Sequence, residues 1–248
     1  MKSIVIVIVV VSFMSFGCTP NTETTKQNNE LESIFNGKDL SGWIIPSGDN
    51  GHWKVVDGVI DYDALSEARG NKSLWTEKEY ADFEITVDWR IKETPFINEY
   101  GRIIKPDGTH KLDENGEDIM ISVPDSDSGI LLRGSSKSQV NIWNWPIGSG
   151  EVYGYRTDSS MPPEVVAGVT PVVNADNNIG EWNTFRITMI GDSLTVVLND
   201  QTVIEDAHLP GIDASGPIGF QHHGRKTDGE WSVSPALVQF RNIFIREL

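Results

Sequence analysis

Hydrophobic and polar residues alternate along most of this chain, in short segments separated by turn residues. In 82–91 every second residue from Phe83 is hydrophobic, and 183–190 and 238–245 follow the same pattern. A period of two indicates a strand with one buried face. The sequence therefore predicts an all-β domain made of two antiparallel sheets packed as a sandwich. The residues expected inside it are Phe83, Ile85, Phe185, Ile187, Val196 and Phe240.

Other segments add turns and short helices to this picture. Residues 194–198 end at Asn199-Asp200, a pair typical of a hairpin turn, before a further strand at 201–204. No long segment has the helical period of 3.6, and short helices are expected only around 64–69 and 163–166.

The segment 93–127 differs from the rest of the chain. It is rich in Asp, Glu, Gly, Pro and Lys, and the sequences Lys105-Pro106-Asp107-Gly108 and Asn115-Gly116 indicate turns. A loop of this length without structure would be unusual in a compact domain unless it is functional. We expect an insertion with one or two small hairpins that forms a lid or rim over a binding face.

The first residues have the pattern of an export signal. Met1-Lys2 is followed by a hydrophobic run at 4–16 and then by Gly17-Cys18. The run is shorter than the roughly 20 residues that span a bilayer as a helix. Residues 1–17 are therefore predicted to be a bacterial lipoprotein signal peptide, with cleavage before Cys18 and lipid on its thiol. The alternative is an ordinary secretory signal with an incidental cysteine.

Export and lipidation predict how the rest of the chain is arranged. The polar segment 18–30 would be a flexible tether, and 31–248 a single β-sandwich domain on the periplasmic or outer side of a bacterial membrane. Cys18 is the only cysteine, so no disulfide is expected and the hydrophobic core alone must stabilise the domain.

The charge of the chain excludes one class of partner. The formal net charge is −16, and the basic residues form no cluster along the sequence. A protein that binds nucleic acid needs a basic patch to neutralise phosphates. Nucleic acid is therefore not an expected partner.

Candidate chemistry is concentrated in 127–158. Alternation places Gln139, Asn141, Trp143 and Trp145 on one side of a strand. Amides that bond hydroxyl groups and flat rings that stack on C–H faces are what a sugar requires. The alternative is that the tryptophans anchor the core while the amides face solvent.

Two further runs add candidates. The glycine-punctuated segment 147–155 brings Glu151 and Tyr153 toward the same cleft, and it lacks the Gly-Lys-Ser/Thr ending of a phosphate loop. His222 and His223 are adjacent on a predicted strand and must point to opposite faces, which disfavours a two-histidine metal site. His223 is the candidate proton carrier, because imidazole titrates near neutral pH.

Familiar catalytic motifs are missing from the sequence. There is no Gly-x-Ser-x-Gly, no His-Glu-x-x-His, and no evident pair of carboxylates of the ordinary glycosidase kind.

Several short segments form an ordered set that spans about 31–248, although no single one of them is specific. They are 35–43, 53–60, 82–84, 127–133, 181–183, 216–221, 223–224 and 240–243. This set resembles the 3-keto-disaccharide hydrolase domain family. Among the departures, His222 stands where the family often has Asp, and the insertion is longer than expected. The resemblance implies a concanavalin-like jelly roll that acts on sugars whose C3 hydroxyl has been oxidised to a ketone.

The implied chemistry needs a base near C2, an acid near the leaving oxygen and a donor for the enolate. On the resemblance, His223 or Glu151 would be the acid/base and Arg133 the enolate stabiliser, a role that a divalent cation could take instead. Substrate hydroxyl groups would be held by Gln139, Asn141, Trp143 and Tyr153. The function expected is a hydrolase of 3-keto-glycosides and 3-keto-disaccharides. A non-catalytic, lectin-like module and a structural surface domain remain the alternatives.

Overall fold

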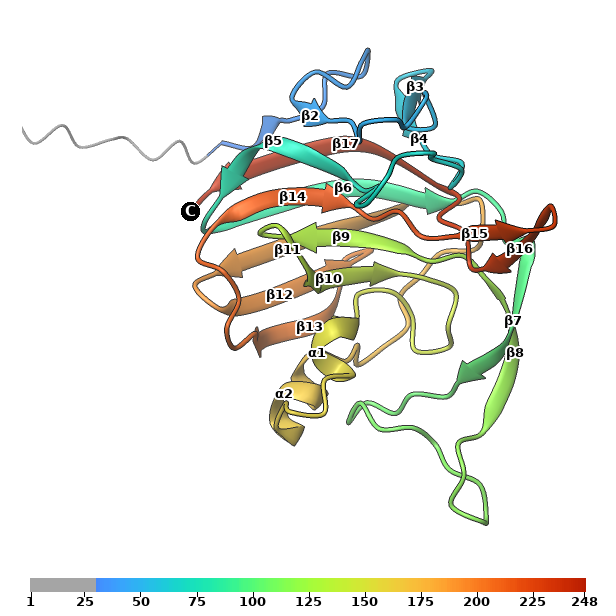
Figure 1. The fold of residues 1–248 in the computed structure, drawn as a ribbon. Coiled ribbons are helices and arrows are strands. Elements are labelled where there is room, and N and C mark those ends of the chain that lie inside the picture. Colours follow the sequence, from blue (N-terminus) through green and yellow to red (C-terminus); the bar gives the residue numbers. More distant parts are fainter. Residues whose placement is uncertain (1–29) are drawn as a thin grey trace, which may run out of the picture.

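The structure is a computed structural model that describes residues 30–248, and two antiparallel sheets packed face to face dominate it (Figure 1). Eight strands form the larger sheet, in which β13, β12, β11, β6, β17, β4 and β3 are neighbours in that order and β1 also pairs with β17. These strands are β1 (Glu32–Ser33), β3 (Lys54–Val56), β4 (Val59–Asp61), β6 (Phe83–Ile91), β11 (Asn183–Ile190), β12 (Ser193–Leu198), β13 (Gln201–His208) and β17 (Val238–Glu247).

The smaller sheet has five strands in the order β10, β9, β14, β5 and β2. Their neighbours in the sheet are mostly distant in sequence, as expected for a jelly roll in which the chain crosses repeatedly between sheets. The strands are β2 (Trp43–Ile44), β5 (Leu74–Tyr80), β9 (Ser128–Leu132), β10 (Ser135–Ile142) and β14 (Gly216–Phe220). The sequence-based prediction of a two-sheet, all-β sandwich is confirmed.

The core lies between the two sheets and contains the hydrophobic residues that the alternation predicted. Phe83, Ile85, Phe185, Ile187, Val196 and Phe240 are all 0 % exposed. Phe220 of the smaller sheet stacks on Phe240 of the larger one, with ring centroids 4.0 Å apart. The strands therefore bury their hydrophobic faces against each other, which is the main source of stability in a domain without disulfides.

Two short helices lie outside the sandwich. The second, α2 (Pro163–Gly168), is where the sequence placed one, whereas α1 (Tyr153–Arg156) was not predicted. The expected helix at 64–69 does not form, and Ala64 at its expected start has a φ of 61° in the left-handed region, which a right-handed helix cannot include. No helix among residues 30–248 is long and apolar enough to cross a membrane.

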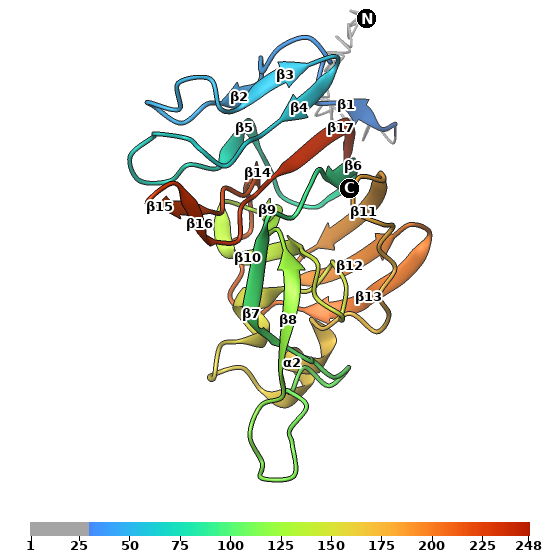
Figure 2. The ribbon, with the colours of Figure 1, turned by 90° about the vertical axis from the view of Figure 1, so that its right-hand side faces the viewer.

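A two-stranded ribbon projects from one end of the sandwich (Figure 2). It consists of β7 (Phe96–Arg102) and β8 (Met120–Asp125), both within 93–127, and a smaller hairpin of β15 (Arg225–Thr227) and β16 (Glu230–Val233) lies beside its base. The predicted signal peptide at 1–17, the lipidation site Cys18 and all of the predicted tether except Glu30 lie outside the described residues.

Candidate functional site

An open cleft of about 420 Å³ lies on the outer face of the smaller sheet, bordered by the β7–β8 ribbon. The sheet and the loops that follow its strands contribute Gln139, Asn141, Trp143, Trp145, Tyr153, Gln221 and His223. The ribbon, the segment after it and the β16 region contribute Phe96, Asn98, Tyr100, Asp125, Asp127, Ser232, Val233 and Ser234.

A chain of amides forms the floor of the cleft. The Gln139 side-chain NH2, which has two hydrogens to donate, lies within hydrogen-bond distance of three acceptors: the carbonyl of Ser128 (3.1 Å), Oε1 of Gln221 (2.8 Å) and Oδ1 of Asn141. Gly129 allows this approach, because a Cβ atom there would lie 2.7 Å from Nε2 of Gln139. The side-chain oxygens of Asn141 and Gln221 accept from Gln139. The NH2 groups of these two residues therefore remain for a ligand.

Two stacked tryptophans form one wall. The rings of Trp143 and Trp145 are 4.6 Å apart and nearly parallel. Trp143 is 4 % exposed and donates from Nε1 to the carbonyl of Gly148, whereas Trp145 is half-buried and donates to Oδ2 of Asp125 at 3.2 Å. Trp143 therefore supports Trp145, and Trp145 presents the more accessible ring to the cleft.

Asp127 and His223 lie close together in the cleft. His223 Nδ1 lies 2.6 Å from the carbonyl oxygen of Ser234 and 3.6 Å from Oδ2 of Asp127. The Asp127 side chain is 25 % exposed and that of His223 is 33 % exposed. Both groups are therefore accessible to a ligand while their positions are held by the protein.

Burial raises the pKa of Asp127 to about 6; the neighbouring Asp125 adds to this effect, while His223 opposes it. Oδ1 of Asp127 is buried without a hydrogen-bond partner among residues 30–248. Asp125 itself accepts hydrogen bonds from Asn98, Trp145 and Ser234 through Oδ2. Two neighbouring carboxylates in different environments are a common basis for assigning separate acid and base roles.

Sequence reasoning missed Asp125, Asp127 and Gln221. Asp127 and Gln221 lie within the segments that resemble the family, so that resemblance was the available signal. Asp125 had no signal of its own, because it comes from the end of the insertion and reaches the cleft only through the pairing of β8 with β7. By contrast, the predicted residues Gln139, Asn141, Trp143, Tyr153 and His223 do lie together in the cleft.

The expected role of Arg133 is corrected by the structure. Its side chain is 1 % exposed and lies beyond the end of β9 that is remote from Ser128, so it does not line the cleft. The guanidinium donates to the carbonyls of Ala81, Gly191 and Asp213 and to the Asp82 carboxylate. Strand β9 ends at Leu132, and Arg133 adopts a φ of 49°, so its side chain does not follow the two-residue alternation of the strand.

Glu151 also does not contact the cleft directly. The bridge between Val140 and Val152 places Glu151 on the same face as Asn141, but the side chain is 0 % exposed and paired with Arg156. Burial raises the pKa of Glu151 to about 7, and Arg156 opposes this rise. Because no ligand can touch Glu151, the acid/base role expected for it is wrong for this structure. Its carboxylate, paired with Arg156, lies buried behind the residues that line the cleft.

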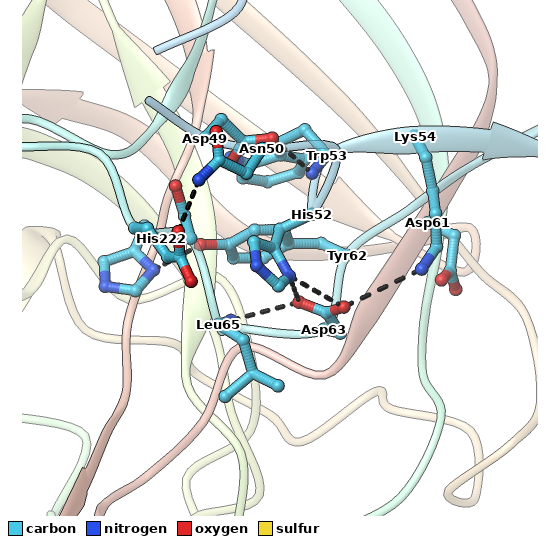
Figure 3. Close-up of polar contacts among 12 residues, drawn as sticks. Asp49, Asn50, His52, Trp53, Lys54, Asp61, Tyr62, Asp63, Leu65 and His222 are labelled. Carbon is cyan, nitrogen blue, oxygen red and sulfur yellow. Dashed lines mark hydrogen bonds and ion pairs between the residues drawn. The ribbon is translucent and has the colours of Figure 1, made fainter. Parts of the chain in front are cut away.

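His222 is held away from the cleft, as the strand alternation predicted. Its Nδ1 lies 2.5 Å from the hydroxyl of Tyr62, which follows β4 in the larger sheet (Figure 3). Trp53 stacks on the Tyr62 ring at 3.7 Å. Burial lowers the pKa of His222 to about 4. This contact joins the segment after β14 of the smaller sheet to the residue after β4 of the larger sheet, and it fixes the backbone that carries His223.

The sequence leaves a divalent cation open as an alternative to Arg133. Residues 30–248 contain no group of three or more His, Cys, Asp or Glu side chains arranged to hold a metal ion. Oδ2 of Asp125 accepts three hydrogen bonds, whereas Oδ1 is buried without a partner among the described residues.

The fold and the cleft define a β-sandwich protein with a site suited to carbohydrate. The chain belongs to the family described as the 3-keto-alpha-glucoside-1,2-lyase-like domain, whose sequence profile matches residues 30–246. This family membership confirms the resemblance seen in the sequence and supports a carbohydrate-active role.

Two solved structures have a similar fold. A candidate glycosyl hydrolase from Parabacteroides distasonis ATCC 8503 is 22 % identical, with a TM-score of 0.57 over 89 % of this chain and 84 % of its own. A second candidate glycosyl hydrolase from that organism is 20 % identical, with a TM-score of 0.53 over 88 % and 94 % of the two chains. No curated protein matches the sequence.

Proposed function

We propose that this protein cleaves glycosides whose C3 hydroxyl has been oxidised to a ketone, by elimination followed by hydration. The observation that carries the proposal is the carboxylate–imidazole pair of Asp127 and His223 at the edge of an amide-lined and tryptophan-lined cleft, in a chain of this family. A ketone at C3 acidifies the C2 proton, so a single base can start the reaction.

The two proton transfers are assigned to this pair. The Asp127 carboxylate takes the proton from C2, the C2 electrons form the enolate, and the C1–O bond breaks as the enolate collapses to a C1=C2 double bond. Nε2 of His223 delivers a proton to the leaving oxygen. Water then adds its oxygen at C1 and its proton at C2, so the net change is hydrolysis.

The amide floor is assigned the role of holding the sugar. The NH2 groups of Asn141 and Gln221 would donate to the C3 oxygen, whose negative charge increases as the enolate forms. Trp145 would stack against a C–H face of the ring. With Arg133 remote from the cleft, these neutral donors are the enolate stabilisers that the residues of the cleft offer.

A direct test is incubation with methyl 3-keto-glucoside and measurement of methanol release. Wild type should release methanol, and His223→Ala should reduce kcat about 10²- to 10⁴-fold while binding changes little. Binding without release by either protein would favour the lectin-like alternative. Binding of no sugar at all, in a thermal-shift panel, would favour a structural surface domain.

Export and anchoring are a separate proposal that rests on the N-terminal sequence. We propose that residues 1–17 are removed and that Cys18 carries lipid, which would hold the domain at a bacterial membrane. Cys18→Ala should move the protein from the membrane fraction to the soluble fraction without changing its melting temperature. Retention of the variant in the membrane fraction would contradict lipid anchoring.

A further inference from the structure

The cleft extends further from Asp127 and His223 than one reacting sugar ring requires. Phe96, Asn98 and Tyr100 are alternate residues of β7, and all three line the cleft. Phe96 pairs with Asp125 at the base of the ribbon. At about 3.3 Å per residue, Tyr100 lies roughly 13 Å further along the strand, which exceeds the length of one pyranose ring.

Tyr100 exposes an aromatic ring that the protein itself does not cover. Within residues 30–248, the large exposed hydrophobic side chains include three aromatic ones, and two of them, Tyr100 (73 %) and Tyr153 (48 %), line this cleft. Aromatic rings left open beside a binding cleft are well suited to stacking on a ligand ring. The two tyrosines come from β7 and α1, so they border the cleft from separate elements.

The ribbon that carries Tyr100 is held in place by the rest of the domain. In the loop beyond β7, a Cβ at Gly108 would lie 2.6 Å from Val166 of α2, so the loop packs closely on that helix. Further along, His110 lies 3.4 Å from Arg156 and 2.9 Å from Asp118, which also pairs with Arg102 of β7. These contacts make the ribbon a positioned wall of the cleft.

The charge of the residues that line the cleft limits which ligands can bind there. The cleft-lining residues include Asp125 and Asp127 and, among the described residues, no Lys or Arg. A carboxylate or sulfate on the ligand would therefore meet like charge with no Lys or Arg to compensate it, and the imidazole of His223 already lies beside the Asp127 carboxylate. An uncharged ring is the ligand that this part of the cleft fits.

We propose that the β7–β8 ribbon forms a subsite for a second, uncharged ring attached to C1 of the reacting sugar, and that Tyr100 determines specificity there. The assignment of that ring to the leaving group rests on the proposed function, because C1 is the carbon that must carry a substituent in any substrate. The ligand group that this subsite would bind is a ring with an apolar face. Either a second sugar or an aryl group can supply such a ring.

The test compares Tyr100→Ala with Leu112→Ala, a control at a 52 % exposed residue of the same insertion outside the cleft. The substrates are methyl 3-keto-glucoside, phenyl 3-keto-glucoside and a 3-keto-glucosyl-glucose. Tyr100→Ala should raise KM for one or both ring-bearing substrates roughly 3- to 10-fold, and leave the methyl compound and kcat unchanged. The substrate affected identifies the ring as sugar or aryl. An equal change for all three substrates, no change for any, or the same effect in Leu112→Ala would overturn the proposal.

A binding experiment separates this inference from the proposed reaction. Tryptophan fluorescence can follow the binding of methyl glucoside, phenyl glucoside, a glucose disaccharide and a uronic-acid disaccharide, none of them oxidised at C3. If the wild-type protein cleaves no keto sugar, the proposed reaction fails. The subsite would still be upheld if Tyr100→Ala, but not Leu112→Ala, bound either uncharged two-ring ligand more weakly than wild type. Tighter binding of the uronic-acid disaccharide than of its neutral counterpart would overturn the uncharged-ring assignment.

Discussion

The imidazole of His223 is oriented by the carbonyl of Ser234, whose oxygen lies 2.6 Å from Nδ1. A carbonyl oxygen only accepts hydrogen bonds, so Nδ1 must carry a hydrogen. Nε2 is then the nitrogen that exchanges a proton with a ligand. Asp127, 3.6 Å from Nδ1, adds a carboxylate to the same side of the cleft.

Replacing Asp127 with Asn should separate catalysis from folding. The amide has almost the same shape but cannot take the C2 proton, so kcat/KM should fall about 10²- to 10⁴-fold. Leaving-group release from a 3-keto-glucoside is the measurement. Asp200→Asn, at an exposed hairpin turn outside the cleft, is the matched control and should retain full activity. Full activity of Asp127→Asn would remove the carboxylate from the mechanism.

The pH dependence of kcat/KM should report Asp127. Because its pKa is raised to about 6, the carboxyl is protonated below that pH and cannot act as a base. We expect kcat/KM to fall about tenfold per unit as the pH drops below about 6. A rate that is constant from pH 5 to 7 would contradict this assignment.

The fall in kcat/KM at low pH cannot be caused by unfolding linked to protonation of Asp127. An ordinary Asp releases its proton near pH 4 in the unfolded chain, while the folded chain keeps it to about 6. The folded state thus binds more protons between these values, and the contribution of Asp127 to stability falls as the pH rises. Urea unfolding at pH 4.5 and 6.5 should show this difference, and Asp127→Asn should reduce it.

Arg133→Met should damage stability, with little effect on the reaction itself. The change leaves the carbonyls of Ala81, Gly191 and Asp213 without their donor, so the free energy of unfolding should fall by about 3 kcal/mol or more. Urea denaturation measures the loss, and Lys38→Met, at an exposed residue, is the control. A stable variant with strongly reduced kcat would instead restore the catalytic role expected from the sequence.

Phe185→Ala tests the core that the alternation predicted. Phe185 is 0 % exposed and its ring centroid lies 5.4 Å from that of Trp89. The cavity should lower the free energy of unfolding by about 3–5 kcal/mol. Ile190→Ala, at the 53 % exposed end of the same strand, should cost much less. Similar losses in the two variants would contradict a core centred on Phe185.

Strand alternation predicts that Gln139 and Asn141 share a face of β10, and both line the cleft because a two-residue period is a local property of the backbone. Trp143 and Trp145 also line the cleft, but they follow the end of β10 at Ile142. The same reasoning predicted that His222 and His223 diverge. The roles that the resemblance implied for Arg133 and Glu151 do not match their surroundings. Arg133 is a left-handed residue just after β9, and the Glu151 carboxylate is buried against Arg156.

The all-β class, the core residues and the sugar-suited character of one strand face could be predicted from the residues alone, since each follows from their order along a strand. That Asp125 and Asp127 join His223, that Arg133 ties loops together and that Tyr100 stands beside the cleft became visible only in the folded chain. These relationships depend on which distant segments pair and how the ribbon is anchored. Neither is encoded in a local pattern, because contacts between segments remote in sequence arise only when the whole chain packs.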